Sequence, residues 1–218
     1  MNSELRQYHA NLLGHADAME YMARRFIGLD VLETFAIGYS GDSKFSEYSR
    51  RIMFPVHNEQ GVCVGYQARL LYHEPERPKY FHGKLEKAEY VCGLWELSQR
   101  IVDFGAVVLV EGHFDMFAYY QAGGVPAVPL LGTSLSTRQA LILRRYTEVV
   151  IGGFDSDSAG KKAGERVVEV CAKAGLKYYQ PLRHREAVKD AAEVWQKYGA
   201  AGMRRYNAYA QRIVAEAY

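Results

Sequence analysis

The feature that most constrains the fold is an alternation of short apolar runs with helical patterns across the second half of the chain. Runs of β-branched and other apolar residues lie at 107–110, 126–130 and 149–154, and each is followed by a stretch with helical spacing. A shorter run at 177–180 continues the series. Continuous apolar runs of this length are typical of strands buried on both faces of a parallel sheet. We therefore predict an α/β fold, in which a parallel sheet is covered by helices through right-handed crossovers.

Acidic residues follow two of these runs. Glu111 comes directly after the first run, and Asp155 and Asp157 follow the third. In an extended backbone, two residues separated by one position point the same way. Ligands of parallel sheets bind beyond the carboxyl ends of the strands, and converging carboxylates suit Mg²⁺ or Mn²⁺. If the aspartate pair is taken alone, helix capping explains it better than metal binding does. Glu111 favours a metal site if its strand is a neighbour of the strand that precedes the aspartates.

Two further aspartates and a histidine are candidates for this site. Asp115 lies one helical turn beyond Glu111, where an interaction with the helix dipole explains it almost as well as metal binding. Asp190 lies near the end of the fourth predicted strand, where capping and catalysis fit equally. His113 suits proton transfer or contact with substrate, although a structural role is commoner for such a histidine.

The segment after the second run is a candidate phosphate site. Gly132, Thr133 and Ser134 follow that run and open a predicted helix at 136–146, so their backbone N–H groups and hydroxyls could hold a phosphate. The segment lacks the lysine and glycine spacing of a P-loop. As a motif alone it indicates only a well-capped helix.

The first third of the chain has a different organisation. Residues 3–35 have helical spacing, and the runs 51–56 and 62–70 flank a turn-rich segment, which predicts a β-hairpin with Pro55 at an edge or a bulge. Residues 72–87 are predicted to form a surface loop, and residues 93–100 a short helix. This region is rich in basic residues, among them Arg50, Arg51, Arg69, Arg77, Lys79, Lys84 and Lys87. A basic lobe beside an acidic metal site suits a polyanionic substrate, although a solvated charged surface is the simpler explanation of the charges alone.

Composition narrows the class of protein. The 218 residues carry a net charge of +2, which does not by itself indicate a nucleic-acid-binding protein. The three cysteines are far apart, so the sequence predicts neither a disulfide framework nor a Cys-x-x-Cys zinc site. No apolar run approaches the ~20 residues of a membrane span, and the N-terminus has no signal-peptide pattern, so we expect a cytoplasmic protein without membrane contact.

Taken together and in order, these motifs resemble the catalytic core of bacterial-type (DnaG-like) DNA primases, which is built on a TOPRIM domain. The TOPRIM pattern of a strand-end glutamate followed later by Asp-x-Asp is met by Glu111, Asp155 and Asp157. The resemblance spans nearly the whole chain. It also rests on residues 35–39, 51–56, 65–69, 78–80, 111–115, 131–134, 154–160 and 189–190, which follow the order of the family.

The resemblance implies a fold and a division into domains. It implies a TOPRIM (Rossmann-like) parallel sheet flanked by helices, preceded by a smaller mixed α/β basic lobe. The expected domains are a helical and β-hairpin lobe at 1–104, the TOPRIM domain at 105–185, and a helical segment at 186–218 that completes the core.

It also implies an activity, namely synthesis of RNA primers from ribonucleoside triphosphates on single-stranded DNA. Catalysis would rest on Glu111, Asp155 and Asp157, which with Asp115 and Asp190 would hold Mg²⁺ or Mn²⁺. The residues implied in nucleotide or template binding are Arg51, Arg69, Lys79, Tyr80, Lys87, Gly132, Thr133 and Ser134.

The chain departs from the family in two ways. Ala192 stands where many members have a second aspartate, so one carboxylate of the wider site is missing. The cysteine count gives no zinc-binding domain, which suits a compact version as in a phage or mobile element, or a catalytic fragment. A replicative helicase or a separate zinc-binding protein would then be a partner. Two other functions stay open, a TOPRIM metal-dependent nuclease and a non-catalytic nucleic-acid-binding module.

Overall fold

The structure is a computed structural model that describes residues 2–43, 46–132, 134–154, 158–179 and 188–218. Its contacts divide the chain into two compact units, Met1–Glu86 and Lys87–Tyr218. The boundaries implied by the family resemblance, at 104/105 and 185/186, differ from this division. The difference arises because helix α4 (Leu94–Phe104) packs on strand β5 (Ala106–Val110), and the last helix packs on the same unit.

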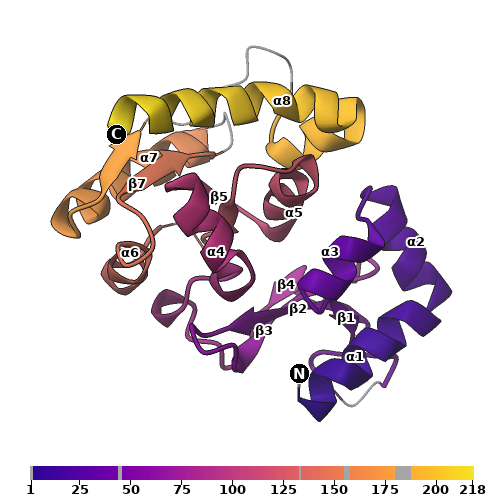
Figure 1. Cartoon of the computed structure of the whole chain (residues 1–218). Coiled ribbons are helices and arrows are strands. Elements are labelled where there is room, and N and C mark those ends of the chain that lie inside the picture. The colour runs from indigo at the N-terminus through magenta and orange to yellow at the C-terminus, as the bar shows by residue number, and fades with distance from the viewer. Residues whose placement is uncertain (1, 44–45, 133, 155–157, 180–187) are drawn as a thin grey trace. The chain divides into compact units, whose positions relative to one another are not determined.

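The first unit combines three helices with a four-stranded antiparallel sheet (Figure 1). Its elements are α1 (Ser3–Gly14), α2 (Ala16–Arg24), α3 (Leu29–Thr34), β1 (Gly38–Tyr39), β2 (Arg51–His57), β3 (Cys63–Leu70) and β4 (Tyr80–Phe81), with the strand order β1-β2-β3-β4. The predicted hairpin is confirmed as β2 and β3. The region expected to be a surface loop contains the short strand β4, which pairs with β3 at Ala68 and Arg69.

Helix α1 packs closely on this sheet. A Cβ atom on Gly38 would lie 2.5 Å from the Cβ of Tyr8, so only glycine allows β1 to approach the helix. The apolar face of α1 buries Leu5 against Met53. Pro55 pairs with β3 next to a β-bulge. It lies beyond the two residues of β2 that pair with β1, so its missing N–H removes no hydrogen bond between β2 and β1.

The second unit is built on a four-stranded parallel sheet (Figure 1). Its elements are η1 (Lys87–Glu89), α4, β5, α5 (His113–Ala122), β6 (Ala127–Pro129), α6 (Thr137–Leu143), β7 (Val149–Gly152), α7 (Ser158–Lys173), β8 (Lys177–Tyr179) and α8 (Ala191–Ala217). The strand order is β6-β5-β7-β8, and every pairing is parallel. The predicted α/β fold is confirmed.

The central strand and its helices form the core of this unit. All five residues of β5 have an exposed fraction of 0%, as expected for a strand covered on both faces. Helix α5 packs on β6 and α8. Helix α8 is interrupted at Gly199 (φ 55°, ψ −150°), within the helical segment expected at 186–218.

Within the described part of the chain, no helix is both long and apolar enough to cross a membrane.

Candidate metal and nucleotide site

The acidic residues of the second unit lie on strands that are neighbours. Strand β5 pairs with β7 in parallel register from Ala106 to Leu109. The N–H of Gly153 donates to the carbonyl of Leu109 over 2.8 Å, which holds the end of β7 beside the end of β5. Glu111 follows β5 at this edge, and the chain after β7 continues through Phe154 toward Asp155 and Asp157. The two strands are neighbours, which is the condition under which Glu111 favours a metal site, whereas Asp155 and Asp157 lie outside the described residues.

Gly153 allows these two strand ends to approach each other. A Cβ atom there would lie 2.6 Å from Cγ1 of Val108 and 3.2 Å from the carbonyl oxygen of Leu109. Real Cβ atoms do not approach other atoms as closely as 2.6 Å, so a side chain at 153 would push β7 away from β5. The glycine therefore fixes where the chain leaves the sheet toward the aspartates.

Asp115 and Asp190 meet at the first turn of α8. Asp115 is only 8% exposed, and its Oδ1 accepts a hydrogen bond from the N–H of Ala192 over 3.0 Å. Asp190 is the N-cap of α8, and its Oδ1 accepts from the N–H of Glu193 over 2.8 Å. Asp190 thus makes the capping contact that is one of its two expected roles, whereas Asp115, which is expected to interact with the dipole of its own helix α5, accepts a hydrogen bond from the first turn of α8. Because a carboxylate has several acceptor sites, capping does not exclude a metal.

His113 has a structural contact. Its ring is buried, and Nε2 lies 3.3 Å from Sγ of Cys92. Burial, and then the charge of Glu96, raise the pKa of the Cys92 thiol well above its usual range. The thiol therefore stays protonated, and the direction of its hydrogen bond with Nε2 depends on the tautomer of the ring. This pairing supports the structural alternative for His113, and no motif in the sequence predicts the contact with Cys92.

Three predicted nucleotide-binding residues form a cluster in the first unit. The Nη1 of Arg69 donates to the hydroxyl of Tyr80 over 2.6 Å, and its Cζ lies 5.2 Å from the centroid of that ring. The Nζ of Lys79 lies 5.9 Å from the same centroid. Arg69 also lies over the ring of Tyr21 on α2, at 5.6 Å, a residue that the sequence reasoning missed. The cross-strand register of Arg69 with Tyr80 brings these groups together.

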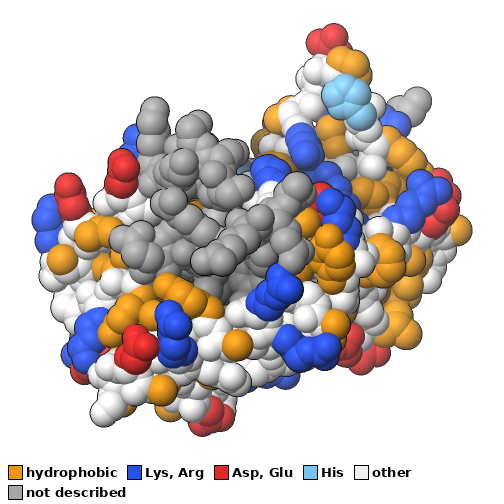
Figure 2. All heavy atoms as spheres, turned by 90° about the horizontal axis from the view of Figure 1, so that it is seen from above, with side chains coloured by type: hydrophobic (Ala, Val, Ile, Leu, Met, Phe, Trp, Pro, Cys, Tyr) orange, Lys and Arg blue, Asp and Glu red, His pale blue; other side chains and the backbone are white. Residues whose placement is uncertain are grey.

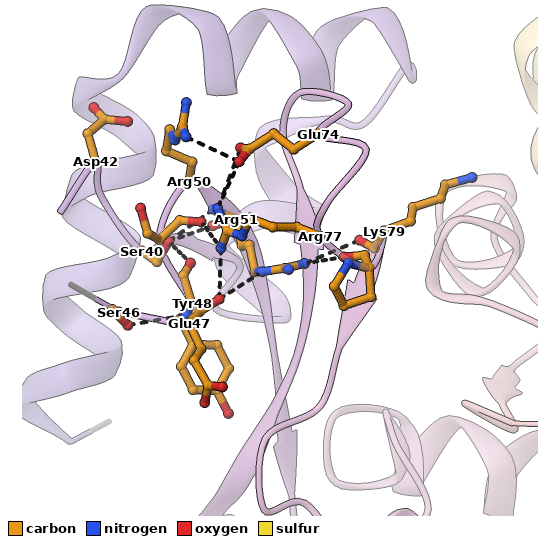
Figure 3. Close-up of polar contacts among 12 residues, drawn as sticks. Ser40, Asp42, Ser46, Glu47, Tyr48, Arg50, Arg51, Glu74, Arg77 and Lys79 are labelled. Atoms are coloured by element: carbon orange, nitrogen blue, oxygen red, sulfur yellow. Dashed lines mark hydrogen bonds and ion pairs between the residues drawn. The ribbon is translucent and has the colours of Figure 1, made fainter. Parts of the chain in front are cut away.

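Arg51 has a different environment, which Figure 3 shows. Its side chain is 1% exposed, and it donates to the backbone carbonyl of Glu47 over 3.1 Å and to that of Pro78 over 3.0 Å. Burial, and then the nearby charge of Arg77, lower the pKa of its guanidinium. These contacts hold together the segments before β2 and β4. The nucleotide contact predicted for Arg51 stays a prediction.

Another charged group lies beside Arg51 (Figure 3). The carboxylate of Glu74 accepts from Arg50 over 3.2 Å and from Arg77 over 3.3 Å. Arg77 also donates to the backbone carbonyls of Glu47 and Ser49, each over 2.9 Å. Some basic side chains of this lobe thus stabilise its own loops.

The segment after β6 leaves the same edge of the parallel sheet as Glu111, since the N–H of Leu130 donates to the carbonyl of Val110. Gly132 and Ser134 are exposed there, and Thr133 lies outside the described residues. Helix α6 begins only at Thr137 and is capped by Ser136. The helix start expected at 136 is therefore confirmed, and residues 131–134 precede the helix without forming its first turn. Ser136 and Gln139 form a capping box, which fixes the start of the helix.

Lys87 lies in the second unit, in the short helix η1. Its backbone carbonyl accepts from the Nε2 of Gln139 over 2.9 Å, and that of Ala88 accepts from Ser136 over 2.6 Å. These bonds attach η1 to the start of α6.

Among the described residues, which exclude Asp155 and Asp157, no three His, Cys, Asp or Glu side chains form a group that could hold a metal ion. On the face seen in Figure 2, Lys and Arg side chains are scattered among Asp and Glu side chains.

The part of the chain that carries the parallel sheet also matches a known protein family. Residues 108–195 match a family described as Toprim-like. Over a longer span the chain is similar to DNA primases. It is 34% identical over 173 residues to the DNA primase of Synechococcus elongatus, across 76% of this chain and 25% of that protein. It is 28% identical over 231 residues to that of Aquifex aeolicus, across 91% and 46%.

Solved structures agree. The crystal structure of the Aquifex aeolicus primase, with its zinc-binding and RNA polymerase domains, matches with a TM-score of 0.83 and 26% identity, over 94% of this chain and 58% of that chain. A DnaG catalytic core matches with a TM-score of 0.77 and 25% identity, over 94% and 77%. The chain is therefore a homologue of the catalytic core of DnaG-type DNA primases, with a Toprim-like domain. It spans between a quarter and about half of the length of the two curated relatives.

Proposed function

We propose that this chain synthesises short RNA primers on single-stranded DNA by divalent-metal-dependent nucleotidyl transfer. The observation that carries the proposal is the parallel pairing of β5 with β7, because the residues that follow these strands are Glu111 and, after Phe154, Asp155 and Asp157. Homology to primase catalytic cores supports polymerisation as the reaction of this acidic edge.

The donor set fits Mg²⁺ or Mn²⁺, because both are hard cations that prefer carboxylate oxygens. Glu111, Asp155 and Asp157 would hold the metal, and Asp115 and Asp190 would complete the wider site. When bound, the metal would lower the pKa of the primer 3′-hydroxyl and offset the charge on the leaving pyrophosphate.

The cationic residues of the chain would hold the phosphates. Arg69, Lys79 and Tyr80 are proposed to contact the incoming nucleotide or the template, and Lys87, Gly132, Thr133 and Ser134 are proposed to contribute from the second unit. For Arg51, the hydrogen bonds to the loop before β4 support an indirect role through the backbone of Lys79. Binding through phosphates weakens as salt rises.

The proposed partners follow from this reaction. A DnaG primase catalytic domain with the same fold has been solved bound to single-stranded DNA, with a TM-score of 0.78 and 24% identity to this chain. For this chain we propose a single-stranded DNA template and ribonucleoside triphosphates as substrates. A replicative helicase or a separate zinc-binding protein would supply initiation, and the reaction would take place in the cytoplasm.

The test is a priming assay with single-stranded DNA, ribonucleotides and either Mg²⁺ or Mn²⁺. The wild-type protein is expected to make oligoribonucleotides, and the Asp155→Ala/Asp157→Ala variant to make none. Asp103→Ala, which removes an exposed carboxylate from α4, is the matched control and is expected to keep the wild-type rate. Degradation of the template without primer synthesis would indicate a nuclease. DNA binding without either reaction would indicate a non-catalytic module.

A further inference from the structure

The first turn of α5 packs against the two residues that precede α4. Sγ of Cys92 lies 3.3 Å from Nε2 of His113, and the two residues are 2% and 4% exposed. The next residue, Gly93, is the N-cap of α4 and has a φ of 75°. A Cβ atom on Gly93 would lie 2.6 Å from Sδ of Met116, a residue that is 1% exposed. Two consecutive residues thus contact two residues of α5 that lie one helical turn apart.

Asp115 lies on another face of the same turn. Each residue of a helix is rotated by about 100° from the one before, so positions 113 and 116 lie about 60° apart, whereas position 115 lies about 160° from the first and about 100° from the second. Oδ1 of Asp115 accepts a hydrogen bond from the N–H of Ala192, in the first turn of α8, over 3.0 Å. The first turn of α5 is therefore held on one face by residues 92–93 and on another face by α8.

This turn carries or adjoins two of the proposed metal ligands. Asp115 is part of the turn, and Glu111 directly precedes its N-cap, Gly112. The N–H of Met116 donates to the carbonyl of Gly112 over 3.3 Å, so the turn moves as one piece. A displacement at His113 would therefore displace Asp115 as well. Side chains that support metal ligands from behind orient them, and their loss typically weakens metal binding or activity by about 10–100-fold.

Resting on the proposed function, we propose that Cys92 and His113 are positioning residues of the metal site, which hold the first turn of α5 so that the Asp115 carboxylate is oriented toward a divalent cation. In this role neither residue touches the metal, and His113 acts through Asp115 rather than by proton transfer. The two residues are 21 positions apart in the chain, so their contact is a property of the fold.

The test compares two buried cysteines of the second unit. Cys92→Ala removes the thiol that contacts His113, whereas Cys171→Ala removes a thiol from α7 that is 0% exposed. Both variants are expected to lower the urea midpoint of unfolding by similar amounts, because each loses the same buried atom. Mn²⁺ binding, followed by the electron paramagnetic resonance signal of the free ion, is expected to weaken about tenfold in Cys92→Ala and less than about twofold in Cys171→Ala.

A second pair of variants tests the hydrogen bond itself. His113→Gln keeps a polar group that can meet the thiol of Cys92, whereas His113→Leu keeps an apolar side chain only. Mn²⁺ binding is expected to stay within about threefold of wild type in His113→Gln and to weaken about tenfold in His113→Leu. Equal binding by these two variants would contradict a role for the hydrogen bond.

Hydrogen exchange at the N–H of Ala192 reports the position of Asp115 without any metal. Exchange is expected to be faster in Cys92→Ala than in Cys171→Ala, because the acceptor of this N–H is held less firmly. A general loss of stability would accelerate exchange equally in the two cysteine variants. Equal exchange rates, or equal weakening of Mn²⁺ binding in both variants, would therefore overturn the positioning role.

Priming assays on the same proteins separate this proposal from the proposed function. If wild type makes primers while Cys92→Ala binds Mn²⁺ normally, the positioning proposal fails and the proposed function stands. If Cys92→Ala binds Mn²⁺ more weakly than wild type but no protein makes primers, the proposed function fails alone. A wild-type protein that binds no Mn²⁺ would overturn both.

Discussion

Two carboxylates of the candidate metal site also hold the first turn of α8. The backbone N–H groups of a first helical turn have no partners within the helix, and a negative charge there is favourable. Asp115 and Asp190 each supply an acceptor, to Ala192 and Glu193 respectively. Ala192 stands where the family resemblance implies a second aspartate, and it contributes its backbone N–H to the contact with Asp115.

The contact between Asp115 and Ala192 predicts how substitutions at 115 will differ. Asp115→Ala leaves the Ala192 N–H without this acceptor and is expected to lower the free energy of unfolding by about 1–3 kcal/mol. Asp115→Asn keeps an acceptor oxygen and is expected to lose clearly less. Urea unfolding measures both, and priming assays run beside it. If Asp115→Asn is stable but inactive, the carboxylate charge itself is needed at the metal; if the two variants are equally unstable, the hydrogen bond is not what holds the helix.

Arg51 is expected to matter first for stability. Arg51→Met keeps much of the buried volume but removes the donors to the carbonyls of Glu47 and Pro78. Leaving buried carbonyls without partners is expected to cost about 2–4 kcal/mol of unfolding free energy. Arg24→Met, at an exposed position, is the control and should change stability by less than about 0.5 kcal/mol. Wild-type stability of Arg51→Met with a raised KM for nucleotide would instead support the direct contact predicted from the sequence.

At the residue scale, sequence patterns predict which residues belong to a site more accurately than they predict the contacts of those residues. Arg69, Lys79 and Tyr80 were named together because of their family order, but their contact depends on the register of β3 with β4. Tyr21 lies in the segment expected to be helical, and nothing in its local spacing indicates that it contacts Arg69 across the unit. The same holds for the pairing of His113 with Cys92.

At the scale of elements, long periodic segments were predictable and short ones were not. The hairpin β2–β3, helix α5 and the strand–helix alternation follow from local spacing. Strands β1 and β4 have two residues each and exist because the hairpin offers them partners, so no local pattern identifies them. The order β6-β5-β7-β8 is likewise a tertiary property, and it is what makes Glu111 a neighbour of the segment that follows β7.

The close approach of β5 and β7 predicts the effect of a single methyl group. In Gly153→Ala the new Cβ would meet Val108 at 2.6 Å, so β7 must shift. We expect a loss of about 1–3 kcal/mol of unfolding free energy from overpacking. Because Asp155 and Asp157 follow directly, priming activity should fall further than stability explains.

Gly14→Ala is the matched control for this glycine substitution. Gly14 is the last residue of α1, and an added Cβ would meet no atom within 4 Å. Alanine there is expected to be neutral or to stabilise by up to about 1 kcal/mol. Unfolding in urea and a priming assay on both variants are the measurements. Wild-type activity in Gly153→Ala would show that the spacing of the two strand ends does not govern catalysis.

At the scale of the whole molecule, each unit carries a different half of the proposed chemistry. The carboxylates follow strands of the second unit, whereas the cluster of Arg69, Tyr80 and Lys79 lies in the first. The net charge of +2 therefore describes neither region, and binding of nucleic acid should depend on local contacts that salt weakens rather than on overall charge. The sequence predicted this separation, because the basic residues precede the acidic strand ends along the chain.

Both units also contain buried or half-buried groups with a raised pKa, which predicts alkaline instability of the whole molecule. In the first unit, burial and the charge of Glu4 raise the pKa of Tyr8 to about 12. In the second unit, burial raises the pKa of Cys171, and likewise that of Tyr178, to about 12. Between the ordinary values of 9.0 for the thiol or 10.0 for the phenol and about 12, the folded chain holds protons that the unfolded chain has released. Stability contributed by these groups is therefore complete below pH 9 and falls as the pH rises toward 12.

Urea unfolding at a series of pH values, with tyrosinate absorbance followed in parallel, tests this expectation. Tyr178→Phe removes one titrating hydroxyl while keeping the ring, so its unfolding free energy should fall less steeply than that of wild type across the alkaline range. Tyr198→Phe, at a position that is 49% exposed, is the reference for the loss of a surface hydroxyl. An unfolding free energy that stays constant from pH 9 to pH 12 in wild type would contradict the prediction. It would mean that these side chains reach water in the folded state as readily as in the unfolded chain.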